Sequence, residues 1–161
     1  MTMPGRDSQG RDGTDHYQRP GWFTRNVMNR AVGWLTRRGL SVWGSRVLEV
    51  PGRRSGQPRR VPVNLLVVEG AEYLVAPRGK AEWVRNVRAA DGHLDLLLGR
   101  SREHRGATEV ADVDKADVLR PYLRRWKAEV GVFFDGVTAD SSDDELQRVA
   151  PRHPVFRLAP R

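Results

Sequence analysis

Several features are missing from this chain, and each absence excludes a class of protein. None of its 161 residues is a cysteine, which excludes disulfides, thiolate metal sites and a cysteine nucleophile. The longest uninterrupted apolar run is Leu65–Val68, too short for a transmembrane helix. The first residues, MTMPGRDSQGRDG, lack the apolar stretch of a signal peptide. We therefore expect a cytoplasmic protein.

Lysine is scarce as well, since only three of the 28 basic residues are Lys. The first 60 residues hold twelve Arg and four acidic residues, whereas the rest of the chain holds sixteen bases and sixteen acids. The whole net charge of +8 therefore lies in the first 60 residues. A GC-rich genome would explain the use of Arg in place of Lys, but it would not explain this placement. The asymmetry predicts an anionic partner, which could be a phosphorylated cofactor, a nucleic acid or a lipid surface.

The pattern of apolar and turn residues predicts one α+β domain, mainly β with a few helices. Residues 1–20 are polar and rich in Gly, Asp and Arg, so we expect a disordered leader followed by a single domain over residues 21–161. Helical spacing predicts helices at Pro20–Arg38, Ala81–Ala90 and Asp114–Val130. Strands are expected at Arg46–Val50, Arg59–Val68, Glu72–Ala76, His93–Leu98, Arg105–Ala111 and Val155–Leu158. The most economical architecture for this order is a small antiparallel barrel with packed helices, with Pro62 at a strand edge or bulge.

The turn Gly52–Arg60 between the first two strands carries the sharpest local signal. Two glycines, a hydroxyl and four guanidiniums lie within it. Glycine lets backbone N–H groups come close to a ligand, and Arg pairs with phosphate or carboxylate through two N–H groups at once. The segment is not a P-loop, because the G-x-x-x-x-G-K-[ST] spacing is missing and no helix follows. It could be a solvated turn, but its composition is typical of an anion cradle.

A second cluster follows the third strand. Pro77-Arg78-Gly79-Lys80 precedes a predicted helix, and helix N-termini attract anions. Trp83 and Asn86 lie three residues apart in that helix, which places them on one face. Taken singly, Trp83 would more often be a core residue and Asn86 a solvated one. In a hairpin-linked barrel, this strand end can lie beside the Arg-rich turn.

These segments together resemble the deazaflavin-dependent nitroreductase and quinone reductase family of actinobacteria. The motifs are G-R-R-S-G-Q-P-R at Gly52–Arg59, V-P-V at Val61–Val63 and V-A-P-R-G-K-A-E-W-V-R-N at Val75–Asn86. The resemblance extends from about residue 45 to residue 160. It implies a split β-barrel like those of flavin reductases and pyridoxamine-phosphate oxidases, here with an N-terminal amphipathic helix. It also implies binding of coenzyme F420, a deazaflavin that carries a phosphodiester and an oligoglutamate tail.

The resemblance implies the site residues as well. The positions that match the cofactor-binding motifs are Arg53, Arg54, Ser55, Gln57, Arg59, Ala76, Pro77, Arg78, Gly79, Lys80, Trp83 and Asn86. Lys80 stands where a second glycine is common, so contacts with the tail would differ here.

The acceptor side is predicted from the C-terminal helix region. Family members that act on nitroaromatics place several tyrosines there, whereas this chain has Trp126, Phe133 and Phe134 with Tyr122 as the one hydroxyl. An apolar wall of this kind favours a quinone or lipid-like acceptor over a nitroaromatic. The cofactor would supply the hydride, and water or Tyr122 would supply the proton. No carboxylate pair, histidine pair or Ser-His-Asp set is recognisable, and no metal is expected.

Three alternatives stay open at this point. One is a non-catalytic binder of lipid or of an anionic cofactor, because the helix Trp22–Arg38 carries Trp and Arg that suit a membrane interface. Packing of this helix on the barrel is the simpler explanation of its apolar face. Nucleic-acid binding is another. Because no recognised motif accompanies the charge, we expect no nucleic-acid partner. The third is the same barrel holding FMN as the cofactor of a reductase.

Overall fold

The computed structural model describes residues 44–161, and these form a closed six-stranded antiparallel barrel with helices on one side and at one end. Around the barrel the strands run β1-β2-β3-β6-β5-β4. Their bounds are β1 Ser45–Pro51, β2 Pro58–Val68, β3 Ala71–Val75, β4 His93–Leu98, β5 Ser101–Glu109 and β6 Val155–Pro160. The helices are α2 Glu82–Ala89, α3 Ala116–Val130 and α4 Asp143–Val149, with short 3-10 turns at Asp112–Asp114, Gly131–Phe133 and Ala150–Arg152.

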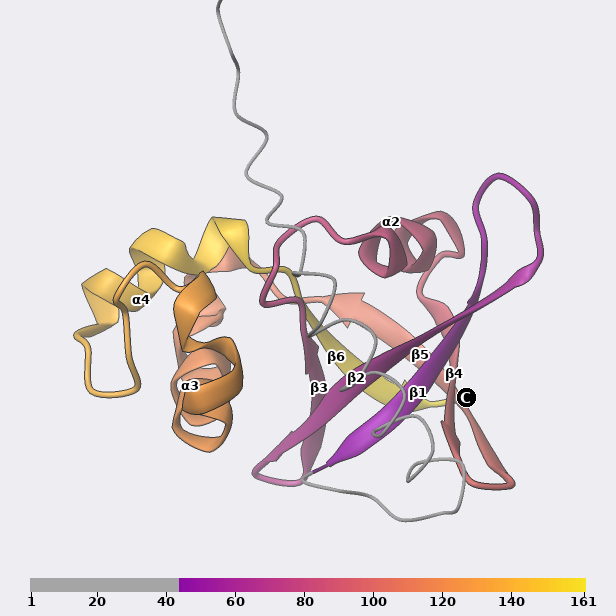
Figure 1. Ribbon diagram of the computed structural model, residues 1–161, viewed down its shortest axis with the longest axis horizontal. Helices are drawn as coiled ribbons and strands as arrows, with labels where there is room; N and C mark the ends of the chain where they lie inside the picture. Colours follow the sequence, from indigo (N-terminus) through magenta and orange to yellow (C-terminus); the bar gives the residue numbers. More distant parts are fainter. Residues whose placement is uncertain (1–43) are drawn as a thin grey trace, which may run out of the picture.

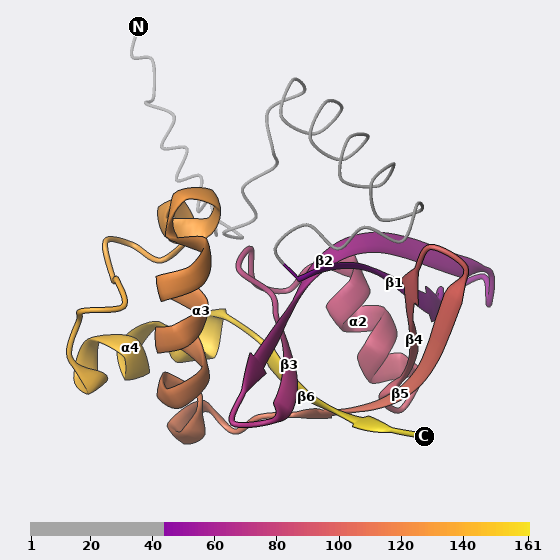
Figure 2. The ribbon, with the colours of Figure 1, turned by 90° about the horizontal axis from the view of Figure 1, so that it is seen from below.

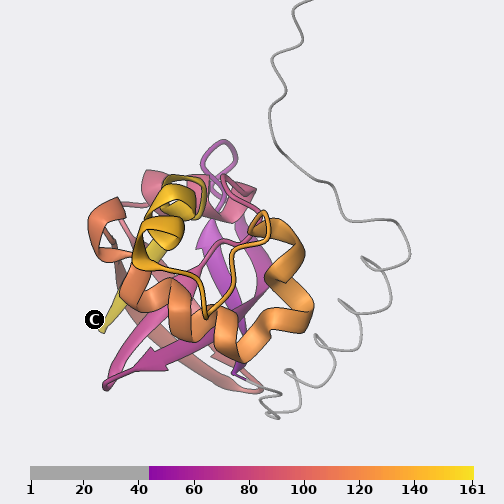
Figure 3. The same ribbon diagram turned by 90° about the vertical axis from the view of Figure 1, so that its left-hand side faces the viewer.

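Alternation along β2 and β3 builds two apolar cores from one wall. Leu65 and Leu74 lie in the core inside the barrel, whereas Leu66 and Val75 lie in a second core under α3 and α4. Neighbouring residues of a strand face opposite sides of the sheet, so both faces of this wall are covered. Figures 1 and 3 show α3 and α4 packed together beside the barrel.

Helix α2 closes one end of the barrel. Its Val84 and Val87 are fully buried and belong to the same core as Leu48 of β1 and Phe156 of β6. Figure 2 looks through the ring of strands, with α2 across its far end. The chain reaches α2 directly from β3 and leaves it into β4, so the ends of β1, β3 and β4 gather around this helix.

The predicted α+β class and antiparallel barrel are confirmed, with differences at the edges of elements. Strand β5 begins at Ser101, earlier than predicted, and the helix predicted from Asp114 begins at Ala116 after a 3-10 turn. Helix α4 was not predicted, although Ser142 and Glu145 form its capping box. Pro62 lies where β2 pairs only with β1, as expected for a residue without an N–H.

The predicted leader 1–20 and the helix Pro20–Arg38, with its proposed membrane contact, lie outside the described residues and stay predictions. Among residues 44–161, no helix is both long enough and apolar enough to cross a membrane.

Candidate functional site

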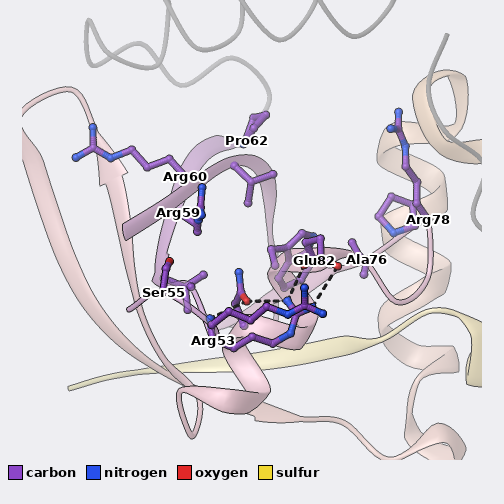
Figure 4. Close-up of a pocket in the computed structure, with 16 residues that line it drawn as sticks. Arg53, Ser55, Arg59, Arg60, Pro62, Ala76, Arg78 and Glu82 are labelled. Atoms are coloured by element: carbon purple, nitrogen blue, oxygen red, sulfur yellow. Dashed lines mark hydrogen bonds and ion pairs between the residues drawn. The ribbon is translucent and has the colours of Figure 1, made fainter. Parts of the chain in front are cut away.

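A cavity of about 760 Å³ lies between the β1–β2 turn, the end of β3 and the start of α2. Figure 4 shows the side chains around it. The lining residues are Val50, Gly52, Arg53, Arg54, Ser55, Arg59, Arg60, Val61, Pro62, Ala76, Pro77, Arg78, Ala81, Glu82, Trp83 and Asn86. Two stretches of the chain, residues 50–62 and 76–86, therefore meet at one cavity.

The β1–β2 turn is compact because its glycines allow it to be. The Gly52 N–H donates to the Gln57 carbonyl at 2.8 Å, and the Gly56 N–H donates to the Gly52 carbonyl at 2.7 Å. A Cβ on Gly52 would come within 3.1 Å of the Ser55 Oγ and 3.2 Å of the Arg59 Nε. Only glycine therefore fits at position 52 without moving the side chains that face the cavity.

Helix α2 anchors this turn through Arg53. The backbone N–H and the Nη1 of Arg53 both donate to the Asn86 Oδ1, at 3.2 and 3.1 Å. The same Nη1 donates to a Glu82 carboxylate oxygen at 2.6 Å. The hydrogen bond from Arg53 holds the pKa of Glu82 below its usual range. Arg53 and Asn86 thus join the turn to the helix, and the Glu82 carboxylate stays ionised.

The other side of the cavity is the segment after β3. Backbone pairing continues past the strand, since the Ala76 N–H donates to the Pro154 carbonyl at 2.9 Å. Gly79 then turns the chain at a φ of 79°. The Arg78 guanidinium lies over the Phe133 ring, 5.1 Å from its centroid, and Figure 4 shows this side chain pointing away from Arg53. Arg78 therefore links the cavity rim to the helical layer.

Positive charge dominates the cavity. Five arginines and one acid are among its described lining residues. Arg53 pairs with Glu82, and the Arg60 Nε donates to Glu49 at 2.5 Å. Glu49 is nearly buried, and its hydrogen bonds from Arg102 and Arg60 hold its pKa below the usual range. Arg54, Arg59 and Arg78 make no ion pair with an acidic side chain of residues 44–161, but Arg78 lies over the Phe133 ring at the rim. Arg54 and Arg59 therefore line the cavity from the turn without an ion-pair partner.

An apolar section complements these charges. Val50, Val61, Ala76 and Trp83 line the same cavity, and the Trp83 ring is braced by Phe156, with centroids 5.7 Å apart. One cavity thus offers apolar and aromatic surface beside two guanidiniums, Arg54 and Arg59, that have no ion-pair partner in the described chain. This combination suits a ligand with a flat apolar part and an anionic part.

No group of His, Asp and Glu side chains in the described chain could hold a metal ion.

Most residues matching the cofactor motifs come together here. The cavity lining includes Arg53, Arg54, Ser55, Arg59, Ala76, Pro77, Arg78, Trp83 and Asn86. Gln57, Gly79 and Lys80 do not line it. Gln57 closes the turn through its carbonyl instead, and Gly79 shapes the loop that carries Arg78.

The predicted acceptor wall is wrong for three of its four residues. Tyr122, Trp126 and Phe134 are at most 2 % exposed in the core under α3 and do not line the cavity. Their helix packs its apolar face on the outside of the barrel, which buries the rings. Burial, with a smaller effect of Glu129, raises the pKa of Tyr122. Because its side chain is buried away from the cavity, Tyr122 is not placed to give a proton to a ligand there. Phe133 is partly buried and contacts Arg78 at the rim.

Sequence reasoning missed Glu82 and Arg60 as lining residues. Glu82 precedes Asn86 by four residues, so both lie on one helix face, and this spacing could have identified it. Arg60 follows Arg59 in a strand, where alternation predicts that only one of the two faces the cavity. Both line it because Arg60 lies at its edge, held by Glu49.

Comparison with known proteins identifies one family. The family model described as F420H(2)-dependent quinone reductase matches residues 23–138. No curated protein is similar enough to match the chain.

Solved structures share the fold. An F420-H2 dependent reductase (FDR-A) superposes with a TM-score of 0.52 at 17 % identity, over 72 % of this chain and 94 % of that one. A chain described as a domain-swapped dimer has a TM-score of 0.53 at 19 % identity, over 85 % and 97 %. The protein Atu2129 of unknown function from Agrobacterium tumefaciens has a TM-score of 0.54 at 15 % identity, over 84 % and 56 %. At these identities the likeness shows the fold alone.

Proposed function

The chain belongs to the F420H(2)-dependent quinone reductase family, and from that premise we propose that it binds reduced coenzyme F420 in the cavity beside α2 and reduces a quinone-like acceptor there. We also propose that its barrel is of the split type found in flavin reductases and pyridoxamine-phosphate oxidases. Bound reduced F420 supplies a hydride, and the protein supplies binding, orientation and electrostatics.

One observation carries this proposal: Arg54 and Arg59, two guanidiniums without an ion-pair partner among the described residues, share one cavity with an apolar surface lined by Trp83. A deazaflavin ring needs the apolar surface, and its phosphodiester and tail need the guanidiniums. A simple lipid headgroup or a free phosphate would leave the Trp83 side unused.

Individual residues divide between these two tasks. Arg54, Ser55 and Arg59 would hold the phosphodiester and the first part of the tail, because they sit together on the turn. Ala76, Pro77 and Trp83 would border the ring. Asn86 accepts hydrogen bonds from Arg53 and so holds the turn against α2. The turn supports this fit, because a Cβ at Gly52 would crowd the Ser55 hydroxyl and the Arg59 guanidinium, which line the cavity.

The acceptor would use what remains of the apolar lining, with Phe133 and Arg78 at the rim. The proton that completes the reduction would come from water. Glu82 is ionised, since Arg53 holds its pKa low, and Tyr122 is buried away from the cavity.

A titration of purified protein with F420 tests the proposal, with quenching of the cofactor's fluorescence as the readout. We expect binding at micromolar protein and a roughly 10- to 100-fold weaker Kd in Arg54→Ala, because a charge-assisted contact contributes about 1.5–3 kcal/mol. Arg157→Ala removes the same charge from an exposed position on β6 outside the cavity, and we expect it to keep the wild-type Kd.

Two outcomes would overturn the proposal. One is no quenching at micromolar protein, and the other is FMN binding in the same assay more tightly than F420. Turnover with menadione and reduced F420 then separates an enzyme from a cofactor-storage protein.

A further inference from the structure

The cavity beside α2 contains a single acid. Glu82 is the only acidic residue among its described lining residues, where five are arginines. Its carboxylate lies 2.6 Å from the Arg53 Nη1 and 3.2 Å from the Arg85 Nη1. The Glu82 carboxylate therefore pairs with the Arg53 guanidinium in the part of the cavity that would bind anions.

Arg53 does not depend on Glu82 for its position. Its backbone N–H and its Nη1 both donate to Asn86, whose side chain is buried. The Glu82 side chain is 68 % exposed, and an exposed ion pair contributes little to stability. Loss of the Glu82 charge would therefore leave Arg53 in place and free its guanidinium for another anion.

We propose that Glu82 is a specificity-determining residue, which limits how many negative charges a ligand can place beside Arg53 and so selects cofactors with short anionic tails. This inference rests on the proposed function of the same cavity. A tail carboxylate that reaches α2 must either displace Glu82 from Arg53 or lie next to it. Both cost binding free energy, and the cost grows with each added carboxylate near the helix. The phosphodiester on the turn and the ring beside Ala76, Pro77 and Trp83 would keep their own contacts, so the cost falls on the tail carboxylates.

The variant Glu82→Gln tests the inference because glutamine keeps the length and a carbonyl acceptor for Arg53 while it removes the charge. Kd is measured for three ligands: the deazaflavin chromophore without phosphate or tail, F420 with one glutamate, and F420 with five or more glutamates. We expect the Kd of the chromophore to stay within about twofold of wild type. The Kd for the long tail should fall about three- to tenfold, with the one-glutamate form between.

Glu109→Gln is the matched control. Glu109 pairs with Arg88 at 2.6 Å and is exposed, as Glu82 is, but it does not line the cavity. Glu109→Gln removes the same charge from the protein, and we expect its effect on Kd not to depend on tail length. The effect of Glu82→Gln should also shrink as salt is raised, because salt screens exposed charges beyond about 10 Å at 0.1 M.

Each remaining outcome decides against the inference. An equal change for all three ligands, or the same dependence in Glu109→Gln, would mean that only net charge matters. Weaker binding of every ligand by Glu82→Gln would mean that Glu82 serves to position Arg53. If the wild-type protein binds none of the three, the proposed function fails and this inference with it. Tight wild-type binding without tail discrimination sinks the inference alone.

Discussion

Arginine has three different environments around one cavity. Arg53 and Arg60 pair with Glu82 and Glu49, Arg78 lies over the Phe133 ring, and Arg54 makes no ion pair among the described residues. A guanidinium paired with an acid of the protein is already neutralised, whereas one without an ion-pair partner can bind a ligand. The residue type alone does not distinguish these roles, because neighbouring side chains decide which guanidinium is already neutralised.

His153 is buried, and its ring stacks on Phe134 with centroids 3.9 Å apart. Neither ring nitrogen has a hydrogen-bond partner among residues 44–161. Burial lowers the pKa of His153 to about 4, although the nearby backbone of Ala76 and Pro77 partly offsets this. The imidazole is therefore neutral in the folded protein at neutral pH.

Acid should destabilise the protein through His153. The unfolded chain takes up a proton near pH 6.5, whereas the folded chain does so only near pH 4. Stability from this residue is complete above pH 6.5 and is lost as pH falls toward 4, by about 3 kcal/mol in total. Urea unfolding between pH 7 and 4 should show this loss, and His153→Phe should flatten that part of the profile. An equal slope in both proteins would exclude His153 as the cause.

The connections between elements depend on a few backbone conformations. Gly92 joins α2 to β4 at a φ of 78°, and a Cβ there would come within 2.2 Å of the Ala107 carbonyl oxygen. Gly70 joins β2 to β3 at a φ of 80° with open space around it. Both need the left-handed region, but only Gly92 is also enclosed by backbone.

This contrast predicts unequal costs for two identical substitutions. Gly70→Ala should lower the free energy of unfolding by about 1 kcal/mol, the cost of left-handed backbone alone. Gly92→Ala should cost about 3 kcal/mol or more, because β5 must also move. Urea unfolding measures both. Since α2 carries Asn86, Gly92→Ala should also weaken cofactor binding, and equal costs for the two variants would contradict the packing argument.

At the scale of the whole molecule, one wall of strands is shared by two cores. Leu48 is fully buried inside the barrel and Leu119 is fully buried under α3. Because β2 and β3 contribute to both cores, the helical layer and the barrel should unfold together.

Truncation in either core tests this cooperativity. Leu48→Ala and Leu119→Ala should each lower the free energy of unfolding by about 2–5 kcal/mol. Both should retain one transition that is coincident by tryptophan fluorescence and far-UV circular dichroism. Val132→Ala, at a position 74 % exposed, should change stability by less than about 0.5 kcal/mol. Two separate transitions in Leu119→Ala would show that the helical layer unfolds on its own.

Sequence alone determined the local elements and the chemistry of the turn. Alternation identified the strands of the barrel, and the glycines and arginines at Gly52–Arg60 predicted an anion cradle, because these signals arise within a few residues. Tertiary structure decided the rest. Closure through β1–β4 and β3–β6 pairs brought Arg54 and Arg78 to one cavity. The docking of α3 on the outer wall buried Tyr122, Trp126 and Phe134. An apolar helix face has the same sequence pattern whether it lines a ligand pocket or packs on another layer of the protein. Only the tertiary structure shows that α3 packs on the barrel wall.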